Sequence, residues 1–526
     1  MMKYFLFCSL FFSLSLQAQS PYDVQHYQLG VRIVKGSSKV FIDESITIQL
    51  SERMARLELD LAGPLANGSG MKVISVTAPN QKLTWQQTLT SLQIDLPSNL
   101  QNGALTLGIK LEGKPADGLI IGANKYGDTT FFADNWPNRA HFWYACHDHP
   151  SDKATYAFLV EAPSIYQVVA NGSLLSKIPK PERNAVVWHY AIDEPIATKV
   201  AVVGVADFIS KEIAVVHDIP IYGTVYPKDS IQALASFEVA PEILAFFEVL
   251  VGPYPFKELN NVQSTTRYGG MENAGCIFYD ENSLTVDLRS THLIAHEVAH
   301  QWFGNAISEA DWQHLWLSEG FATYLTNMYI ETHEGQEAFY KQLQSDRIRV
   351  SNLYNKGFQQ ALVDSLTPSL LDRLNANAYQ KGAWVLHMLR HEMGDSLFKV
   401  GLQQFYTTYK YQNATSQDFA HLMDSLSPKD LAPFFNQWLY QVGHPQLKTR
   451  ILTQKGKQYI EITQVQANLF AFPLQIKISK EGSSMEVLNF NVSQRKEQFE
   501  IPDEFIGKEV QLMMDPNMKL LFEPVY

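Results

Sequence analysis

Two histidines and a glutamate lie within five positions of the chain, in the run HEVAH. His296 and His300 are four residues apart, so on a helix they lie on one face, a turn apart, and can bind one ion together. Neutral imidazole is a ligand that Zn²⁺ prefers. Glu297 would lie beside the metal, where it can act as a base on a metal-bound water. A helix that carries two histidines for structural reasons is the alternative that this motif leaves open.

A third candidate ligand follows in the run LWLSEGFATYL. Eighteen residues separate His300 from Glu319, and Ser318-Glu319-Gly320 before an apolar run is typical of the start of a second helix. A pair of helices can bring this carboxylate to the same ion. Two histidines and one glutamate leave the fourth position for water, which is the arrangement of a catalytic zinc site. The sequence therefore predicts one Zn²⁺ per chain.

Upstream of these residues stands the run GGMEN, residues 269–273. Two glycines beside a large apolar residue and an acid are typical of a turn. From the residue types alone, Glu272 is either a charge on the surface of that turn or a group placed for binding.

Four motifs in this order together resemble the gluzincin aminopeptidase family, which includes aminopeptidase N and leukotriene hydrolase. The motifs are GGMEN, HEVAHQWFGN, LWLSEGFATYL and AYQKGAWVLHML. Nearer the N-terminus, WYACHDHPSDKATYAF is similar to the family's Cys-x-Asp-x-Pro-x-x-Lys-Ala signature. We therefore expect His147 and His149 to belong to a structural turn and not to a metal site. The resemblance extends from about residue 22 to residue 445.

The resemblance implies a catalytic machinery of five residues. His296, His300 and Glu319 would bind zinc. Glu297 would be the general base and would then pass the proton to the leaving amine. Tyr379, in Tyr-Gln-Lys-Gly-Ala, matches the tyrosine that stabilises the oxyanion of the tetrahedral intermediate.

The same resemblance implies an exopeptidase that removes the N-terminal residue from peptides with a free N-terminus. Glu272 matches the acid that holds the free α-ammonium of the substrate. Gly269, Gly270, Met271 and Asn273 would border the bound peptide. Relatives often supply a Gln or Glu to the amine pocket shortly before the cysteine signature, where this chain reads FFADNWPNRAHFWYAC. Asp134 is the candidate there, and the preferred first residue stays open.

Three other functions share part of this pattern. Epoxide hydrolysis, as in leukotriene hydrolase, uses the same zinc site. A zinc endopeptidase shares HExxH but has no need of GGMEN. A non-catalytic scaffold would be expected to have lost a ligand or the base, whereas all of them are present in this chain.

The elements that must position these residues change along the chain. From about residue 22 to 208 the apolar residues alternate, as in Leu105, Leu107, Ile109 and Leu111, which predicts short strands. Helical patterns follow from Asp229 to about residue 438, with an interruption at Pro241, and alternation returns afterwards.

We expect a multidomain α+β protein with an N-terminal β-sandwich, a mainly helical catalytic domain similar to thermolysin, and a small C-terminal β-sandwich. The predicted boundaries are 1–18 for a signal peptide, 19–209, 210–443 and 444–526. About 80 residues follow the catalytic region, so we expect a short form of the family that lacks the C-terminal helical domain and has a cleft more open to longer peptides.

The first 20 residues are typical of a secretory signal peptide. Lys3 precedes an apolar run from Tyr4 to Leu16, with a small residue for cleavage at Ala18. Lipidation at Cys8 is the weaker reading because the small residues expected before a lipidated cysteine are missing. We expect export to a periplasm or out of the cell, without stable membrane insertion.

Composition indicates an ordinary globular protein of 526 residues, 46% apolar and 18% charged. With 42 basic and 54 acidic residues it is a poor partner for nucleic acid. Once Cys8 has left with the signal, Cys146 and Cys276 could form a disulfide or remain two buried thiols. The oligomeric state is not indicated.

Overall fold

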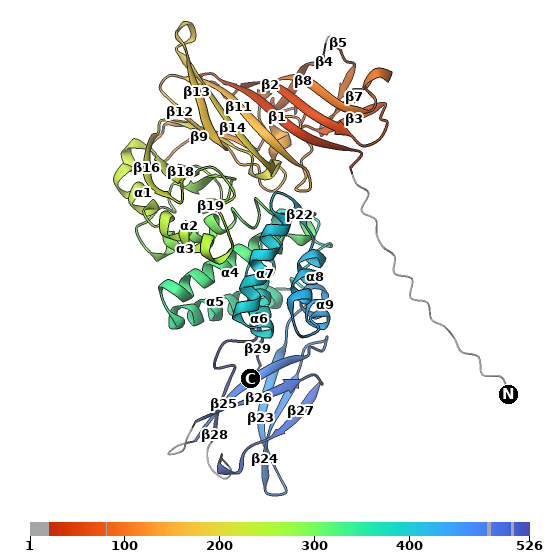
Figure 1. The fold of residues 1–526 in the computed structure, drawn as a ribbon, viewed down its shortest axis with the longest axis vertical. Helices are drawn as coiled ribbons and strands as arrows, with labels where there is room; N and C mark the ends of the chain where they lie inside the picture. Colours follow the sequence, from red (N-terminus) through yellow and green to blue (C-terminus); the bar gives the residue numbers. More distant parts are fainter. Residues whose placement is uncertain (1–19, 80, 481–484, 506–509, 526) are drawn as a thin grey trace, which may run out of the picture.

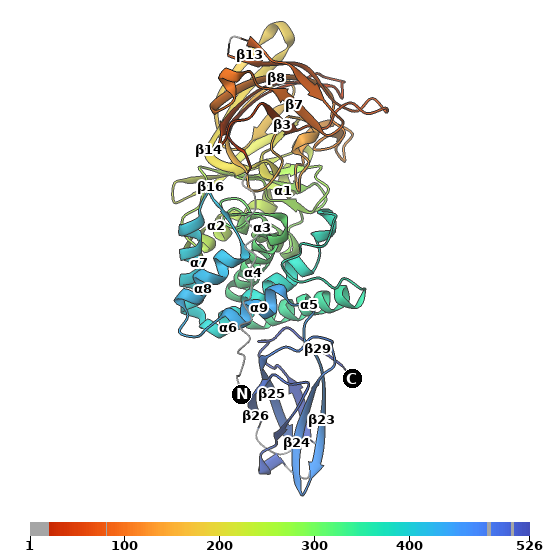
Figure 2. The same cartoon turned by 90° about the vertical axis from the view of Figure 1, so that its right-hand side faces the viewer.

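Three regions follow one another along the long axis of the molecule (Figures 1 and 2). The computed structural model describes residues 20–525, apart from residues 80, 481–484 and 506–509. A β-rich region at one end and a smaller β region at the other flank a mainly helical middle. The predicted fold class is therefore confirmed. The predicted signal peptide, with Cys8 and Ala18, lies outside the described residues and stays a prediction.

The N-terminal region is built on an eight-stranded sheet. Residues 105, 107, 109 and 111 of one of its strands are at most 3% exposed, as the alternating pattern predicted. In spatial order the strands are β13 (Ser173–Lys180), β14 (Ala185–Ala197), β11 (Lys153–Pro163), β1 (Tyr22–Ile33), β2 (Val40–Leu50), β8 (Gly103–Lys114), β4 (Gly70–Ala78) and β5 (Gln81–Lys82).

Two smaller sheets complete this region. Their strands are β12 (Gln167–Ala170), β15 (Val203–Ala206), β10 (Thr129–Ala133) and β9 (Leu119–Ala123) in one, and β3 (Arg56–Asp60), β7 (Ser91–Asp95) and β6 (Trp85–Gln87) in the other.

The middle region begins with a five-stranded sheet. Its strands are, in spatial order, β16 (Ile209–Val216), β17 (Ile219–Val225), β18 (Leu259–Ser264), β20 (Cys276–Asp280) and β19 (Gly270–Met271). β19 is the short edge strand, and it contains the second glycine of GGMEN. It pairs antiparallel with β20 through Gly270 opposite Tyr279 and Met271 opposite Phe278.

Helices form the rest of the middle region. Pro241 lies in the first turn of the second helix, where its missing N–H costs nothing, so the predicted interruption separates two helices. The helices are α1 (Ser230–Phe237), α2 (Ala240–Leu250), α3 (Leu288–Ala299), α4 (Trp316–His333), α5 (Gln336–Asn355), α6 (Gly382–Met393), α7 (Asp395–Tyr409), α8 (Ser416–Leu426) and α9 (Ala432–Tyr440).

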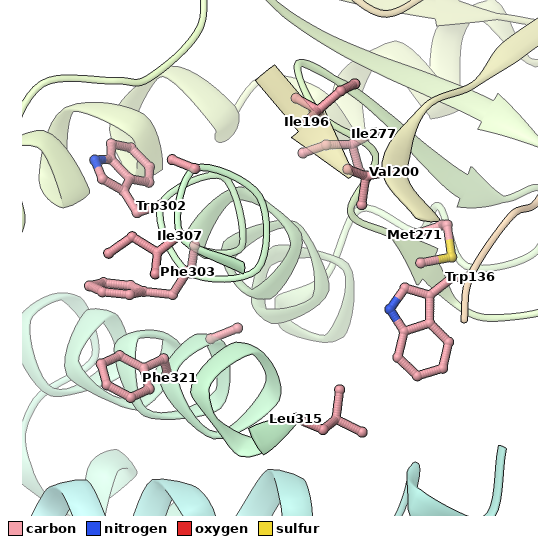
Figure 3. Close-up of a cluster of buried hydrophobic side chains, with 14 of the residues drawn as sticks. Trp136, Ile196, Val200, Met271, Ile277, Trp302, Phe303, Ile307, Leu315 and Phe321 are labelled. Atoms are coloured by element: carbon pink, nitrogen blue, oxygen red, sulfur yellow. The ribbon is translucent and has the colours of Figure 1, made fainter. Parts of the chain in front are cut away.

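A buried aromatic cluster holds the end of α3 against α4. Figure 3 shows Trp302, Phe303 and Ile307, from the segment after α3, beside Phe321 of α4. The rings of Phe303 and Phe321 have centroids 4.6 Å apart, and both side chains are fully buried. Asp287 caps the other end of α3 by accepting hydrogen bonds from the backbone N–H groups of residues 289 and 290. The helix that carries HEVAH is thus fixed at both ends.

The C-terminal region contains two small sheets. They consist of β27 (Lys496–Glu500), β24 (Lys457–Gln464), β23 (Gln446–Gln454) and β29 (Glu523–Pro524), and of β26 (Glu486–Val492), β25 (Phe472–Lys480) and β28 (Val510–Met514).

Cys146 and Cys276 are both buried free thiols, so the disulfide alternative is not realised. Within the described residues, no helix is both long enough and apolar enough to span a bilayer.

Candidate active site

Three side-chain atoms converge between α3 and α4. The Nε2 atoms of His296 and His300 are 3.1 Å apart, and the Oε2 atom of Glu319 lies 3.5 Å from the first and 3.3 Å from the second. Ligands of a tetrahedral zinc ion at about 2.05 Å are separated by about 3.3 Å. The triangle therefore has the size that a single Zn²⁺ requires. The predicted ligands are brought together because α3 supplies the histidines and the first turn of α4 supplies the carboxylate.

The backbone fixes which nitrogen of His300 faces the site. Its Nδ1 lies 3.1 Å from the carbonyl oxygen of Phe303 and can only donate to it. In the neutral imidazole the proton is therefore on Nδ1, and the lone pair of Nε2 faces the site, where a metal could bind it. Ser318 Oγ lies 3.2 Å from the same Nδ1.

Three buried carboxyl groups give the site an excess of negative charge. Burial, together with the charge of Glu319, raises the pKa of Glu272 against the opposing effect of His300. Burial, together with the charges of Glu272 and Glu319, raises the pKa of Glu297 well above its usual range. Burial would also raise the pKa of Glu319, but His300 and His296 outweigh it and hold this pKa well below its usual value. Against the effect of burial, Glu319 and Glu272 raise the pKa of His300 to about 9.

The acids of the cluster thus favour a positive charge on His300 where no metal is bound, and they would favour a bound cation in the same way. Oε2 of Glu319 and Oε1 of Glu272 are buried without a hydrogen-bond partner. Two imidazoles and a carboxylate, with unpartnered acidic oxygens, fit a zinc ion. Among the described residues, the groups that could hold a metal all belong to this cluster, and His147 and His149 are in none of them.

Gly270 lies directly against the side chain of Glu297. A Cβ atom at position 270 would be 2.3 Å from Oε1 and 2.5 Å from Cδ of this carboxyl group. Only glycine leaves room for the carboxyl beside the ligands. At Gly269 the nearest atom to an added Cβ would be 3.5 Å away, which is ordinary contact.

The backbone of Glu272 is held from the segment that follows α3. Its carbonyl oxygen accepts hydrogen bonds from Nε2 of Gln301 at 3.0 Å and from Nδ2 of Asn305 at 2.5 Å. Oε1 of Gln301 also accepts the backbone N–H of Gly275 at 2.9 Å. Carboxylate atoms of Glu272 and Glu297 and a nitrogen of His300 lie within 4.8 Å of one another. Glu272 is thus a fixed, buried acid beside the ligands.

Tyr379 lies in a five-residue π-helix, Asn377–Lys381, just before α6. The Glu319 carboxylate lies close enough to its hydroxyl to act on its pKa, and its ring is nearly parallel to that of His296 with centroids 5.9 Å apart. Burial, reinforced by Glu319, raises its pKa well above the usual value, so the hydroxyl keeps its proton. It can therefore donate a hydrogen bond into the site.

Two glycines set the distance between α4 and the π-helix. A Cβ at Gly320 would be 2.8 Å from Cα of Gly382, and one at Gly382 would be 2.9 Å from Cα of Gly320. The two backbones therefore touch without a side chain between them. This contact brings Tyr379 close to Glu319, one position before Gly320.

A cavity of about 60 Å³ adjoins these groups. Gly269 and Asn273 do not line it, and Asn273 is fully buried. Three of its lining residues, Trp136, Tyr268 and Leu374, were not predicted: Trp136 and Leu374 come from distant parts of the chain, and Tyr268 directly precedes GGMEN. Of the predicted residues it is lined by Gly270, Met271, Glu272, His296, Glu297, His300, Glu319 and Tyr379.

Asp134 does not reach the cavity. Its Oδ1 lies 2.5 Å from Nη2 of Arg139, and Nε of Arg267 lies 4.0 Å from its Oδ2. The carboxyl is therefore paired with arginine behind the site. Its neighbour Trp136 lines the cavity instead, beside Met271 (Figure 3).

The middle of the chain matches a known family. Residues 235–438 match the Peptidase family M1 domain. The chain is 23% identical to a leucyl aminopeptidase of Saccharolobus solfataricus over 452 residues, which cover 80% of this chain and 56% of that protein. It is 24% identical to aminopeptidase N of Lactococcus lactis, over 80% of this chain and 53% of that protein. The chain thus spans about half the length of these relatives.

Solved structures share the fold. An M1 zinc metallopeptidase from Deinococcus radiodurans superposes with a TM-score of 0.66 at 23% identity, over 78% of this chain and 91% of that one. Aminopeptidase A of Legionella pneumophila, in complex with aspartic acid, superposes with a TM-score of 0.82 at 20% identity, over 96% of this chain and 60% of that one.

Proposed function

Since this chain belongs to peptidase family M1, the gluzincin aminopeptidases, we propose that it is a zinc-dependent aminopeptidase that removes the N-terminal residue from peptides. The observation that carries the proposal is Glu272. Its carboxyl group is buried beside the ligand cluster, and one of its oxygens has no partner. A buried acid of this kind fits the free ammonium group of a substrate, which an endopeptidase does not need to bind.

His296, His300 and Glu319 would hold the zinc. When bound, the ion supplies a Lewis acid that makes water acidic enough to lose a proton near neutral pH. Burial and the two neighbouring acids raise the pKa of the Glu297 carboxyl. A cation held by the three ligands would favour its ionised form, and the ionised carboxylate can act as the base. Glu297 takes the proton of the attacking water and passes it to the nitrogen of the leaving amine.

The protonated hydroxyl of Tyr379 donates a hydrogen bond to the oxygen that becomes negative in the transition state. Because the π-helix already holds this hydroxyl beside the ligands, little reorganisation is needed during the reaction. Glu272 binds the ammonium group and thereby sets the register, so that the first peptide bond reaches the water and the base.

The test compares an L-leucine p-nitroanilide with its N-acetylated form on the zinc-loaded protein. Acetylation removes the positive charge, so we expect kcat/KM to fall by about a hundredfold or more. Equal turnover of the two substrates would contradict the proposal and favour an endopeptidase.

The variant Glu272→Ala should lose most of the activity on the free-amine substrate, by about a hundredfold in kcat/KM, while keeping its zinc. Zinc is measured by mass spectrometry of the metal. Glu238→Ala is the matched control, because Glu238 is an exposed acid directly after α1 and should leave both readouts unchanged. Full activity of the Glu272 variant would show that Glu272 does not bind the substrate and that GGMEN is only a turn.

A further inference from the structure

The proposed mechanism does not use the segment Cys146–Ala154, which matches the family's cysteine signature. In the structure this segment lies where the β-rich N-terminal region meets the middle region. Its single lysine, Lys153, is the first residue of β11. The Nζ atom of Lys153 donates to the carbonyl oxygens of Asn305 at 2.9 Å and Ala306 at 2.8 Å. These two carbonyls belong to the segment that follows the metal-binding helix.

Asn305 connects this lysine to the amine pocket. Its main chain accepts the hydrogen bond from Lys153, while its side-chain Nδ2 donates to the carbonyl oxygen of Glu272. Asn305 is fully buried, so its side chain has no solvent to exchange partners with. Two hydrogen bonds therefore join a residue of the N-terminal region to the backbone of the proposed ammonium-binding acid.

The other contacts at this joint hold the neighbouring backbone. Asn171 Nδ2 donates to the carbonyls of Val200 and Ala274, both at 2.8 Å. Val200 and Ile196 lie beside Ile277 and Met271 in Figure 3. These apolar contacts hold the two regions together, but because they are not directional they do not fix the position of Glu272. Asn171 holds Ala274, two positions further on, whereas Lys153, through Asn305, has the directional bonds that reach the carbonyl of Glu272 itself.

The hydrogen bonds of the Lys153 side chain go to the carbonyl oxygens of Asn305 and Ala306. Among the described residues it has no ion pair, whereas nearby Lys199 is paired with Glu309 at 2.6 Å. Burial, helped by the charge of Lys199, lowers the pKa of Lys153 to about 7. Its role at this position rests on its two hydrogen bonds to the backbone that follows α3.

We propose that Lys153 is a positioning residue: through Asn305 it fixes the main chain of Glu272 and thereby the grip on the substrate's N-terminal ammonium. This inference rests on the proposed function. A lysine that only stabilised the fold would lower the melting temperature without a selective effect on substrate binding.

The test uses the zinc-loaded full chain with Lys153→Met, Lys153→Arg and the control Lys72→Met. Lys72 is an exposed lysine on β4, in the same region. We expect Lys153→Met to raise KM for the leucine p-nitroanilide about tenfold, with a smaller change in kcat and unchanged zinc content. Lys153→Arg keeps a donor and should recover part of the loss, and Lys72→Met should behave as the wild type.

A second readout does not depend on catalysis. Hydrogen exchange followed by mass spectrometry should show about tenfold faster exchange of residues 269–276 in Lys153→Met, with β1 unchanged. An inactive wild type would defeat the proposed function, while this measurement would still decide whether Lys153 fixes the Glu272 segment. Unchanged exchange would overturn the inference.

The double variant Lys153→Met/Asn305→Ala tests the route. If Lys153 acts through Asn305, the double variant should have the same KM as the more impaired single variant. Full additivity of the two effects, or a loss of zinc in Lys153→Met that accounts for its kinetics, would overturn the inference as well.

Discussion

The backbone of Gly270 lies against the carboxyl group of Glu297. Because glycine has no side chain, the carboxyl can lie beside the metal ligands. An added Cβ would be 2.3 Å from Oε1, closer than any real Cβ contact. The position of the proposed base therefore depends on a residue that has no functional group of its own.

Gly270→Ala should therefore displace Glu297 and lower kcat by about a hundredfold, since a shift of about 1 Å can cost that much. Zinc content should stay at the wild-type level, because the three atoms nearest to this Cβ position all belong to Glu297, which is not one of the three ligands. Steady-state kinetics and metal analysis check both statements. Gly269→Ala is the matched control and should remain active, and a loss of equal size there would show that the whole turn is sensitive.

Glu258 provides a prediction about pH that does not involve the active site. Burial raises the pKa of this carboxyl to about 7 from 4.5. The folded state therefore binds more protons than the unfolded state between about pH 4.5 and 7, and the free energy of unfolding falls as the pH rises through that range.

Glu258→Gln removes this dependence. We expect the variant to be more stable than the wild type by about 3 kcal/mol above pH 7 and equal to it below about pH 4.5. Urea unfolding at several pH values measures the difference. Glu238→Gln, at an exposed position, should show no such trend. A constant difference for Glu258→Gln at all pH values would contradict a titrating carboxyl.

At this scale the sequence predicts the residues whose spacing is local. Two histidines one helical turn apart and a glutamate at a helix start need no knowledge of the fold. Asp134 shows the limit, because Arg139 neutralises it through a turn that the residue pattern does not reveal. Gln301 and Asn305 stand inside the HEVAHQWFGN motif, but their partner Glu272 is about 30 positions away, and only the folded chain pairs them.

At the scale of elements, the contact between Gly320 and Gly382 sets how closely α4 approaches the π-helix. The first turn of α4 carries Glu319 and the π-helix carries Tyr379, so the separation of the elements becomes the separation of ligand and hydroxyl. The sequence predicts α4 and α6 as helices from their apolar patterns. It does not predict that they touch at two glycines, or that the turn before α6 is a π-helix.

Gly382→Ala should push these elements apart. The new methyl would meet Cα of Gly320 at 2.9 Å, and we expect a loss of about 1–3 kcal/mol in stability together with a fall in kcat of about tenfold or more. Thermal unfolding and kinetics measure the two effects. Gly122→Ala has open space at its Cβ and should change neither, and a fully active Gly382 variant would show that the spacing is not critical.

At the scale of the whole molecule, the C-terminal region is attached through Arg347 of α5. Its guanidinium lies 2.5 Å from Asp515 and donates to the carbonyl of Leu520 at 2.6 Å. It also lies over the rings of Trp384 and Phe522. In Figure 1 the C-terminal strands lie at the opposite side of the helical region from the N-terminal sheets.

Arg347→Met should cost about 3 kcal/mol of stability, because it leaves Asp515 buried without its cation. kcat/KM should stay within about twofold of the wild type, since no described residue after 443 lines the cavity at the metal ligands. Arg347→Met/Asp515→Asn should recover part of the stability. Lost activity in a folded single variant would show that the C-terminal region supports the site.

The order of the three regions could be predicted from the change of hydrophobic period, since each period reflects a local burial pattern. The joints between the regions could not, because Arg347 and Asp515 are separated by 168 positions and Lys153 and Asn305 by 152. Nothing in the local pattern of a single sequence indicates that residues so far apart are in contact.

The contact of Gly320 with Gly382 also has a genetic consequence. No side chain stands between the two backbones, so substitutions elsewhere on these helices have little means of adjusting the spacing. A glycine codon becomes an alanine codon by a single base change. We therefore expect random mutagenesis followed by selection for activity to recover many changes on the outer faces of α4 and α6, and almost none at these two codons.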